Sequence, residues 1–182
     1  MVLVDDPQMA DRLRSLRNLC FKPEQRFIHD ELGWNFRMTN LQAALGVAQL
    51  ERLDEFVGRK RAMGRTYTEL LRGIDGLQLP IARTDYAENI YWVYPLVLGD
   101  DIPCEAGTLM ELLKAKGIGT RPFFWSIGEQ PVFHKAGLFI GESYPVSARI
   151  ARRGFYIPSG MALTREQQEA VAFAIREVMA GL

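Results

Sequence analysis

The sequence predicts an α/β fold, in which amphipathic helices alternate with short strands. Residues 39–72 carry apolar side chains at three- and four-residue spacing, which is the pattern of an amphipathic helix. Residues 89–98 are rich in β-branched and aromatic side chains, which favour a strand. A helical pattern over 104–116 and a second strand-like run over 118–124 follow, so these three segments predict a split β-α-β unit.

The composition excludes several classes of protein. Of the 182 residues, 48% are hydrophobic and 24% are charged, and basic and acidic residues are equal in number. Such a chain is typical of globular proteins, and its zero net charge gives no electrostatic reason to expect nucleic acid as a partner. No apolar run is long enough to span a bilayer, and residues 1–6 lack the pattern of a signal peptide. We therefore expect a cytoplasmic protein with neither nucleic-acid nor membrane partners.

The cysteines and histidines give no sign of a metal site. Cys20 and Cys104 lie far apart without Cys-x-x-Cys spacing, which fits a reducing compartment. His29 and His134 have no partner at the spacing of metal ligands, so we expect no bound metal.

The central stretch, residues 32–57, begins as an extended run. Trp34, Phe36 and Met38 then fall on one side of the run, and Asn35 and Arg37 fall on the other. An arginine fork beside an amide suits a phosphate group. An isolated Asn-x-Arg also fits an arginine paired with a surface carboxylate and an asparagine in a turn.

A helix follows this extended run. Thr39 and Gln42 form a capping box, which predicts a helix start there. Small residues keep its first turns slim, so that another backbone can approach closely. We expect this helix to continue to about Leu71, with Gly73 ending it and the cations at 59–61 facing solvent.

The other segments are shorter. Residues 2–4 have the pattern of a strand end, and Asp6-Pro7 predicts the start of a helix. Pro95 argues for an edge or a bulge in its strand. Residues 125–144 are expected to be irregular. The closing part is expected to hold a short helix at 145–152, a short strand at 155–158 and a last helix capped by Thr164 and Gln167.

Residues 32–57, 117–133 and 156–164 together resemble the DegT/DnrJ/EryC1/StrS family, which are sugar aminotransferases dependent on pyridoxal 5'-phosphate (PLP). The resemblance covers nearly the whole chain. It implies the C-terminal part of an aminotransferase fold type I chain. Residues 1–38 would then be a remnant of the large PLP-binding domain, residues 39–72 a long connecting helix, and residues 73–182 the small C-terminal α+β domain.

The resemblance also implies roles for particular residues. Asn35 and Arg37 would bind the cofactor phosphate held by the other subunit of a homodimer, whose active site lies at the subunit interface. Arg121, Phe123, Phe124 and Trp125 would bind the nucleotide-sugar substrate, through one charged contact and apolar walls.

Two observations leave this second assignment open. Phe123 and Phe124 fit the core of the small domain equally well. Ser126 and Gly128 stand where the family usually has proline and histidine, which removes a hydrogen-bonding group and puts the sugar, or even the activity, in doubt.

Within the family, residues 90–94 and 120–125 are most similar to the GDP-perosamine synthases. That similarity implies transfer of an amino group, with glutamate as donor, to GDP-4-keto-6-deoxymannose. The product would be an amino sugar for a surface polysaccharide such as the O-antigen.

No catalytic residue is assigned in this chain. The Schiff-base lysine of a PLP enzyme should follow the family's Ser-x-x-x-x-Lys run, and no lysine here does. We therefore expect a C-terminal fragment, natural or engineered, that is inactive by itself. Two alternatives stay open: a PLP-dependent sugar dehydratase of the same family, in which histidine replaces the lysine, and an inactive pseudoenzyme or interaction fragment.

Overall fold

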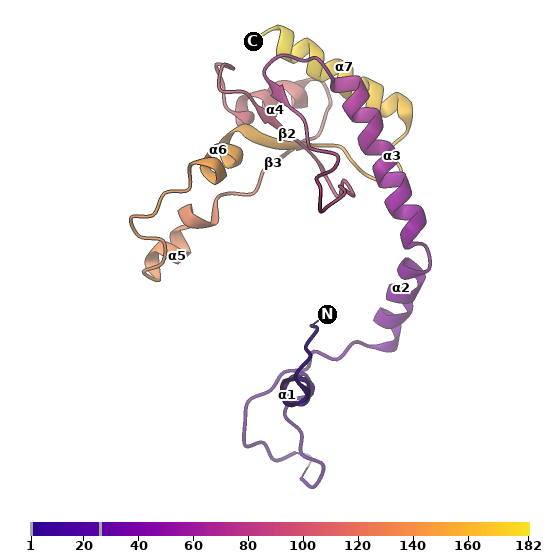
Figure 1. Ribbon diagram of the computed structural model, residues 1–182, viewed down its shortest axis with the longest axis vertical. Helices are drawn as coiled ribbons and strands as arrows, with labels where there is room; N and C mark the ends of the chain where they lie inside the picture. Colours follow the sequence, from indigo (N-terminus) through magenta and orange to yellow (C-terminus); the bar gives the residue numbers. More distant parts are fainter. Residues whose placement is uncertain (1, 26) are drawn as a thin grey trace. The chain divides into compact units, whose positions relative to one another are not determined.

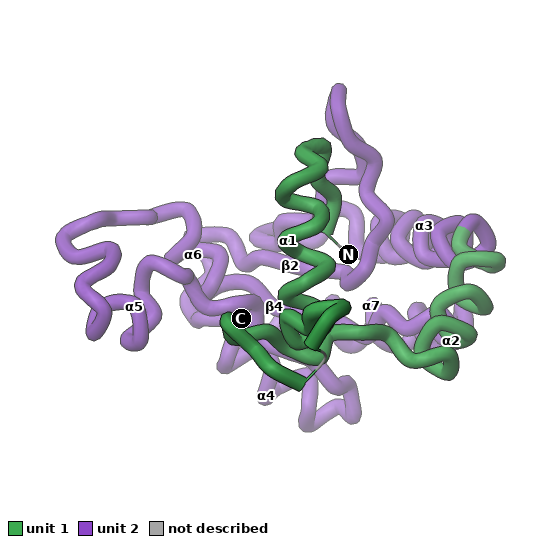
Figure 2. Tube along the Cα trace, turned by 90° about the horizontal axis from the view of Figure 1, so that it is seen from below, with its two compact units in different colours: residues 1–53 green, residues 54–182 purple. Residues whose placement is uncertain are grey.

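The computed structural model describes residues 2–25 and 27–182, and Figure 1 shows its elements in chain order. The chain divides into two compact units, Met1–Leu53 and Asp54–Leu182, which are coloured separately in Figure 2. None of the helices in the described ranges has the length and apolar character needed to cross a membrane.

The first unit contains helix α1 (Pro7–Arg17) and helix α2 (Asn40–Leu50). Asp6 caps α1, because its side chain accepts a hydrogen bond of 3.0 Å from the Gln8 amide, and proline opens the helix as expected. Residues 2–4 were expected to end a strand. They form no strand in the described chain, because a strand needs a neighbouring strand for its hydrogen bonds.

The helix expected over 39–72 is interrupted. It forms as α2 and helix α3 (Leu53–Leu71), with Glu51 and Arg52 in a turn between them. At this point the Arg52 amide bonds to the carbonyl of Gln49, three residues earlier, so the helical ladder tightens and ends. The division into domains at residues 38 and 72 stays a prediction.

The second unit is built on a small antiparallel sheet. Its strands are β1 (Leu77–Gln78), β2 (Tyr94–Leu98), β3 (Arg121–Pro122) and β4 (Gly154–Ile157), in the spatial order β1-β2-β4-β3. Strands β2 and β3 run parallel with β4 between them, and helix α4 (Ala106–Ala115) connects them. The expected split β-α-β unit is therefore confirmed.

Pro95 lies in β2, which is an inner strand of this sheet. The expectation of an edge strand is wrong for β2 as a whole. However, β1 pairs only with Val97 and Leu98, so β2 has a neighbour on one side alone at Pro95. A residue without an N–H group is tolerated there.

One face of the sheet forms the core. Tyr94, Leu96 and Leu98 alternate with outward residues along β2, and Phe155 and Ile157 pair with them from β4. Helices α3, α4 and α7 (Arg165–Ala180) cover this face (Figure 1). Their fully buried members include Tyr67, Leu71, Leu109, Leu113 and Ile175.

Two tyrosines in this core keep their hydroxyl groups paired. The Tyr67 hydroxyl donates to the Pro158 carbonyl at 2.8 Å, and the Tyr94 hydroxyl lies 2.8 Å from the Thr68 hydroxyl. Burial raises the pKa of Tyr94 to about 12 and also raises the pKa of Tyr67.

Helix α3 also packs closely on a loop. The ring of Tyr91, whose backbone has a φ of 51°, lies on the bare backbone of Gly64. A Cβ atom at residue 64 would lie 2.4 Å from Cγ of Tyr91, so only glycine fits here.

The three cations at residues 59–61 were expected to face solvent. Instead, each of them binds a backbone carbonyl. Arg59 donates to Met161 at 2.6 Å, Lys60 donates to Ser159, and Arg61 donates to Asn89 at 3.5 Å. Arg59 is nevertheless exposed as expected, whereas Lys60 and Arg61 are half-buried because their carbonyl partners come from loops far away in the sequence.

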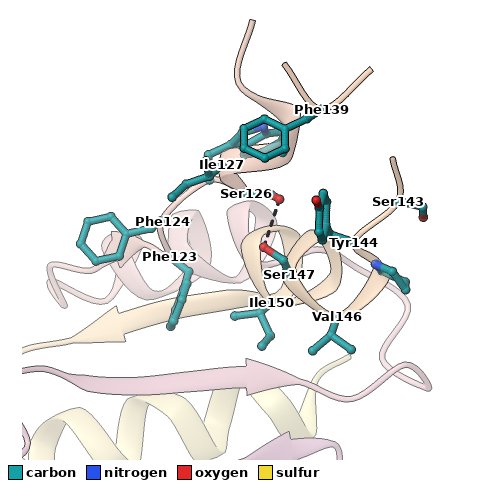
Figure 3. A pocket seen from close by; sticks show the side chains of 13 residues that line it. Phe123, Phe124, Ser126, Ile127, Phe139, Ser143, Tyr144, Val146, Ser147 and Ile150 are labelled. Carbon is teal, nitrogen blue, oxygen red and sulfur yellow. Dashed lines mark hydrogen bonds between the residues drawn. The ribbon is translucent and has the colours of Figure 1, made fainter. Parts of the chain in front are cut away.

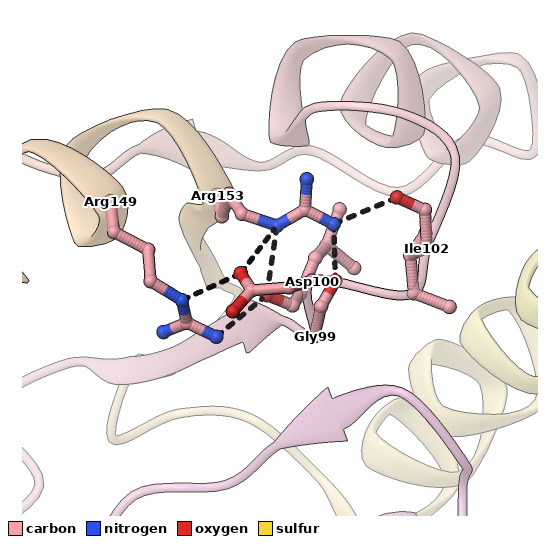
Figure 4. Close-up of polar contacts among 6 residues, drawn as sticks. Gly99, Asp100, Ile102, Arg149 and Arg153 are labelled. Atoms are coloured by element: carbon pink, nitrogen blue, oxygen red, sulfur yellow. Dashed lines mark hydrogen bonds and ion pairs between the residues drawn. The ribbon is translucent and has the colours of Figure 1, made fainter.

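Helix α6 (Pro145–Arg153) lies against the turn that follows β2 (Figure 4). Arg153 bonds to three carbonyls in that turn, those of Leu98, Gly99 and Ile102, and Arg149 bonds to Asp100 at 2.7 Å. The sequence predicted this helix but not its contacts. Two guanidinium groups fix it in place.

Candidate functional site

Asn35 and Arg37 lie side by side on the extended segment of the first unit. The Asn35 side-chain oxygen accepts hydrogen bonds from the backbone N–H and from Nε of Arg37, at 3.4 and 3.5 Å. The rings of Trp34 and Phe36 stack on each other with centroids 6.4 Å apart. The expected alternation of the two faces is therefore confirmed.

Hydrogen bonds to α1 hold this segment. The amides of Trp34 and Phe36 donate to the carbonyls of Leu16 and Arg17, at 2.8 and 3.0 Å. Gly33 lies so close to the chain reversal at Leu19 and Cys20 that a Cβ atom there would be 2.5 Å from the Cys20 nitrogen. The geometry ahead of Asn35 therefore depends on a bare backbone at residue 33.

The expected capping box fixes the other end of the segment. The Thr39 amide donates to the Gln42 side chain at 2.9 Å, and the Gln42 amide donates to the Thr39 hydroxyl at 3.3 Å. Arg37 is thus held between two anchored points.

The guanidinium of Arg37 has no carboxylate partner among residues 2–25 and 27–182. Nε reaches Asn35, and the two terminal nitrogens have no bonded acceptor in this part of the chain. The alternative of an arginine paired with a surface carboxylate therefore finds no support. A guanidinium with unused parallel N–H groups beside an amide fits the oxygen atoms of a phosphate, including that of PLP.

A second set of candidate residues lies in the second unit, on the sheet face away from the core. Arg121 pairs in register with Tyr156, so both side chains emerge on that face. Arg121 is exposed, and the described residues offer it no acidic partner. Its charge is therefore open to a ligand.

Aromatic rings gather beside Arg121. The Tyr156 ring lies 5.0 Å from that of Phe123 and 5.9 Å from that of Phe124, measured between centroids. Phe124 also stacks on Trp92 at 6.4 Å, with the two planes only 9° apart. Phe124 is 64% exposed and Trp92 68%, so the assignment of Phe124 to the core is wrong.

A cavity of about 800 Å³ opens next to these rings (Figure 3). It lies between the segment after β3, which includes the short helices η1 (Ile127–Glu129) and α5 (Pro131–Lys135), and the start of α6. Phe123, Phe124 and Trp125 line it, whereas Arg121 does not, and the role of all four in substrate binding stays a prediction. The other lining residues are Ser126, Ile127, Gly128, Phe139, Ser143, Tyr144, Pro145, Val146, Ser147 and Ile150.

A smaller cavity of about 350 Å³ lies where α3 meets the loops at residues 90–92 and 159–161. Lys60 lines it, and partial burial lowers the pKa of this lysine. Trp92 lines this cavity and stacks on Phe124, which lines the larger one, so exposed aromatic rings connect the two.

Sequence reasoning missed several residues of this face. Trp92 and Tyr156 lie in stretches that carry the resemblance but were given no role in a site, and Tyr144 falls in a segment expected to be irregular. The pairing of β3 with β4 brings Tyr156 beside Phe123 and Phe124, and Tyr144, which directly precedes α6, lines the larger cavity. The aromatic residues clustered at 91–94 were the one feature of the sequence that could have indicated this aromatic face.

Three other lysines form ion pairs. Lys22 pairs with Asp30, Lys114 with Glu111 at 3.4 Å, and Lys116 with Glu177 at 3.0 Å. No lysine lines the larger cavity.

Comparison with known proteins agrees with the resemblance in the sequence. The model of the DegT/DnrJ/EryC1/StrS aminotransferase family matches residues 1–176. The GDP-perosamine synthase of Caulobacter vibrioides is 32% identical over 98% of the chain. That of Vibrio cholerae is 30% identical over 97% of the chain. A dTDP-4-dehydro-2,6-dideoxy-D-glucose 3-dehydratase of Saccharopolyspora spinosa is 27% identical over 86% of the chain and 34% of its own length.

The chain spans about half the length of the curated relatives it matches, 47% for both GDP-perosamine synthases.

Solved structures give the same fold. DesV of Streptomyces venezuelae, crystallised with a ketimine intermediate, superposes with a TM-score of 0.77 at 28% identity, covering 97% of this chain and 46% of that one. The aminotransferase PseC of Helicobacter pylori superposes with a TM-score of 0.86 at 16% identity, covering 98% of this chain and 48% of that one. The expected α/β fold, that of about half of a PLP-dependent transferase chain, is thereby confirmed. The chain belongs to the DegT/DnrJ/EryC1/StrS family of PLP-dependent aminotransferases.

Proposed function

We propose that this chain is the C-terminal part of a nucleotide-sugar aminotransferase that converts GDP-4-keto-6-deoxymannose to its 4-amino sugar, with glutamate as amino donor. The observation that carries the proposal is the match of two GDP-perosamine synthases to almost the whole chain. The product would serve the synthesis of a surface polysaccharide such as the O-antigen.

Asn35 and Arg37 are assigned to the phosphate of PLP. When bound, PLP supplies the electron sink that transamination needs. The unused N–H groups of Arg37 would donate to the phosphate oxygens, and Asn35 would hold the guanidinium in orientation through its side-chain oxygen. We assign this pair to the cofactor of a partner subunit, so that the active site of a homodimer lies at the interface.

Arg121, Phe123, Phe124 and Trp125 are assigned to the nucleotide sugar. Arg121 carries an exposed charge at the end of the aromatic cluster, where it suits the diphosphate. The three aromatic side chains line the adjacent cavity and suit the flat parts of the ligand.

The test uses the complete gene product that contains these residues, with PLP, glutamate and GDP-4-keto-6-deoxymannose. We expect a 4-amino sugar nucleotide, identified by mass spectrometry, and formation of 2-oxoglutarate in equal amount. If the sugar instead loses a hydroxyl group and gains no nitrogen, with ammonia released as glutamate is oxidised to 2-oxoglutarate, the protein is a dehydratase. The Saccharopolyspora spinosa relative is the observation that keeps this second function in view.

The 182-residue chain alone is assigned no activity. None of its lysines stands in the family's Ser-x-x-x-x-Lys context, so adding PLP should give no aldimine absorbance and no transamination. Detectable transamination by the isolated chain would contradict this assignment. If the complete product neither binds PLP nor reacts, the pseudoenzyme alternative is correct.

We place the protein in the cytoplasm. Both cysteines are free, and Cys20 is buried, which fits a reducing compartment. Fractionation of the producing cell, followed by immunodetection, checks this assignment.

A further inference from the structure

The larger cavity of the second unit has an unusual lining, because none of its thirteen residues carries a charge. Five are aromatic, namely Phe123, Phe124, Trp125, Phe139 and Tyr144. A diphosphate needs cations or several N–H donors, so this lining does not suit the charged middle of a nucleotide sugar. The cavity volume of about 800 Å³ lies in the range of small-molecule sites.

The few polar groups in the cavity are already partly engaged. The Ser147 hydroxyl donates to the Ser126 hydroxyl at 3.0 Å, and Ser126 is only 3% exposed. The carbonyl of Gly128 accepts a hydrogen bond of 2.7 Å from Nε2 of His134. A sugar ring would bring many hydroxyl groups and leave most of them unpaired, whereas a planar base needs polar partners only at its edge.

Arg152 contacts one of the lining residues but does not itself line the cavity. The guanidinium of Arg152 lies 5.0 Å from the centroid of the Trp125 ring and pairs with Glu129 at 3.1 Å. This contact fixes the indole and neutralises the charge. Trp125 therefore presents a rigid aromatic surface to the cavity.

Tyr144 forms one wall through its contact with Gly128. A Cβ atom at residue 128 would lie 2.6 Å from Cδ2 and 2.9 Å from Cε2 of the Tyr144 ring, so the ring occupies the space of a missing side chain. The ring edge meets Phe139 with centroids 6.1 Å apart, and the hydroxyl bonds to Glu142. Figure 3 shows Tyr144 beside the Ser126–Ser147 pair.

We infer that Tyr144, seated on the bare backbone of Gly128, forms with Trp125 and the Ser126–Ser147 pair a subsite for the planar, uncharged base of the nucleotide sugar. The inference rests on the proposed function, since it assigns one end of that substrate to this cavity. It makes residue 128 a determinant of specificity, because any side chain there would push Tyr144 into the cavity.

The test measures nucleoside binding to the complete gene product by ligand-observed NMR and calorimetry. The probes are guanosine, thymidine and inorganic pyrophosphate. We expect guanosine to bind, and we expect pyrophosphate not to displace it. Binding of thymidine in place of guanosine would support the subsite and contradict the GDP-sugar assignment. Displacement of guanosine by pyrophosphate would overturn the subsite.

Variants locate the binding. Gly128→Ala should weaken guanosine binding at least tenfold, and Tyr144→Ala should do the same by removing the wall without adding bulk. Tyr144→Phe keeps the ring and should bind within threefold of the original. Gly107→Ala is the control, because a Cβ atom there meets nothing within 4 Å. Unchanged binding in Tyr144→Ala overturns the inference, even if Gly128→Ala fails to fold.

The outcomes separate the subsite from the proposed function. If nucleosides bind as expected but no amino sugar forms, the function is wrong and the subsite stands. If the amino sugar forms while Tyr144→Ala leaves the KM for the nucleotide sugar unchanged, the function stands and the subsite is wrong.

Discussion

At the scale of single residues, Arg37 is the group whose environment most directly indicates a ligand. Its terminal nitrogens have no carboxylate partner in the described ranges, and Asn35 orients it. In the complete gene product, Arg37→Ala should raise the Kd of PLP roughly 10- to 100-fold, because a hydrogen bond to a charged group contributes about 1.5–3 kcal/mol. Titration with PLP, followed by its absorbance, measures this change.

Arg14→Ala is the matched control for that substitution. Arg14 lies in the same unit, but its guanidinium pairs with Asp11 on an exposed helix surface. It should leave PLP affinity unchanged. Equal affinities for the Arg37 and Arg14 variants would remove Arg37 from the cofactor site.

Tyr94, another single residue, makes the stability of the fold depend on pH. Burial raises its pKa in the folded state to about 12, above its usual value of about 10 in the unfolded chain. Between these two values the folded state keeps the proton that the unfolded state loses. The stability present below pH 10 should therefore fall as the pH rises toward 12.

Urea unfolding at pH 9, 10 and 11 measures this loss. Tyr94→Phe removes the titrating group, so its free energy of unfolding should fall less steeply over the same range. Tyr67 also has a raised pKa and remains in this variant, so a residual slope is expected. Parallel slopes for the two proteins would contradict the role given to Tyr94.

At the scale of elements, two glycines of α3 make opposite predictions. Gly64→Ala would place a methyl group 2.4 Å from the Tyr91 ring, and displacing a buried ring should lower the free energy of unfolding by about 1–3 kcal/mol. Gly58→Ala meets nothing within 4 Å and should raise it by about 0.5–1 kcal/mol. Denaturant unfolding of both variants compares them, and a similar effect of the two would show that Tyr91 does not restrict α3.

The position of helix α6 depends on the hydrogen bonds of Arg153. Arg153→Ala removes one charged donor from each of the carbonyls of Leu98, Gly99 and Ile102, so it should destabilise the protein by about 1–3 kcal/mol. Arg165→Ala is the control, because that arginine makes an exposed pair with Glu169 four residues away and contributes less than about 0.5 kcal/mol. Thermal unfolding should separate the two variants clearly, and overlapping transitions would contradict the anchoring role.

Features set by residues close together in the sequence were predicted well. Contacts between residues far apart in the sequence were predicted poorly. The capping box at Thr39 and Gln42 was predicted, because its two side chains lie three residues apart. The break at Glu51 was not, since the apolar spacing continues through it. The carbonyl contacts of the cations at 59–61 were not predicted, because these partners lie 28–102 residues away in the sequence.

At the scale of the whole molecule, the central prediction is that two subunits share each active site. It can be tested with mixed dimers of the complete gene product. One subunit carries Arg37→Ala and the other lacks the Schiff-base lysine of the family, so neither homodimer is active at a PLP concentration well below the raised Kd of the Arg37→Ala protein. If Arg37 serves the partner's cofactor, the mixed dimer contains one intact site, and activity should return on mixing. No recovery, in dimers shown by mass spectrometry to be mixed, would place Arg37 in the site of its own subunit.

The candidate site was predicted only in part at this scale. Phe123, Phe124 and Trp125 line the cavity as expected, because they follow one another in the sequence. The opposite wall comes from α6, and its Tyr144 was not foreseen, since the contact with Gly128 depends on how the chain returns to the sheet. Arg121 points from the neighbouring sheet face and lies outside the cavity lining.

The three carbonyl contacts of α3 have a consequence for how this helix can vary in length. Successive residues on a helix are rotated by about 100°, so Arg59, Lys60 and Arg61 fan out to loops around the helix. Inserting or deleting one residue between Leu53 and Arg59 would rotate these three side chains by about 100° about the helix axis, relative to the preceding turns of α3. Substitutions on the exposed surface of α3 should thus be accepted during evolution more readily than any change in its residue count.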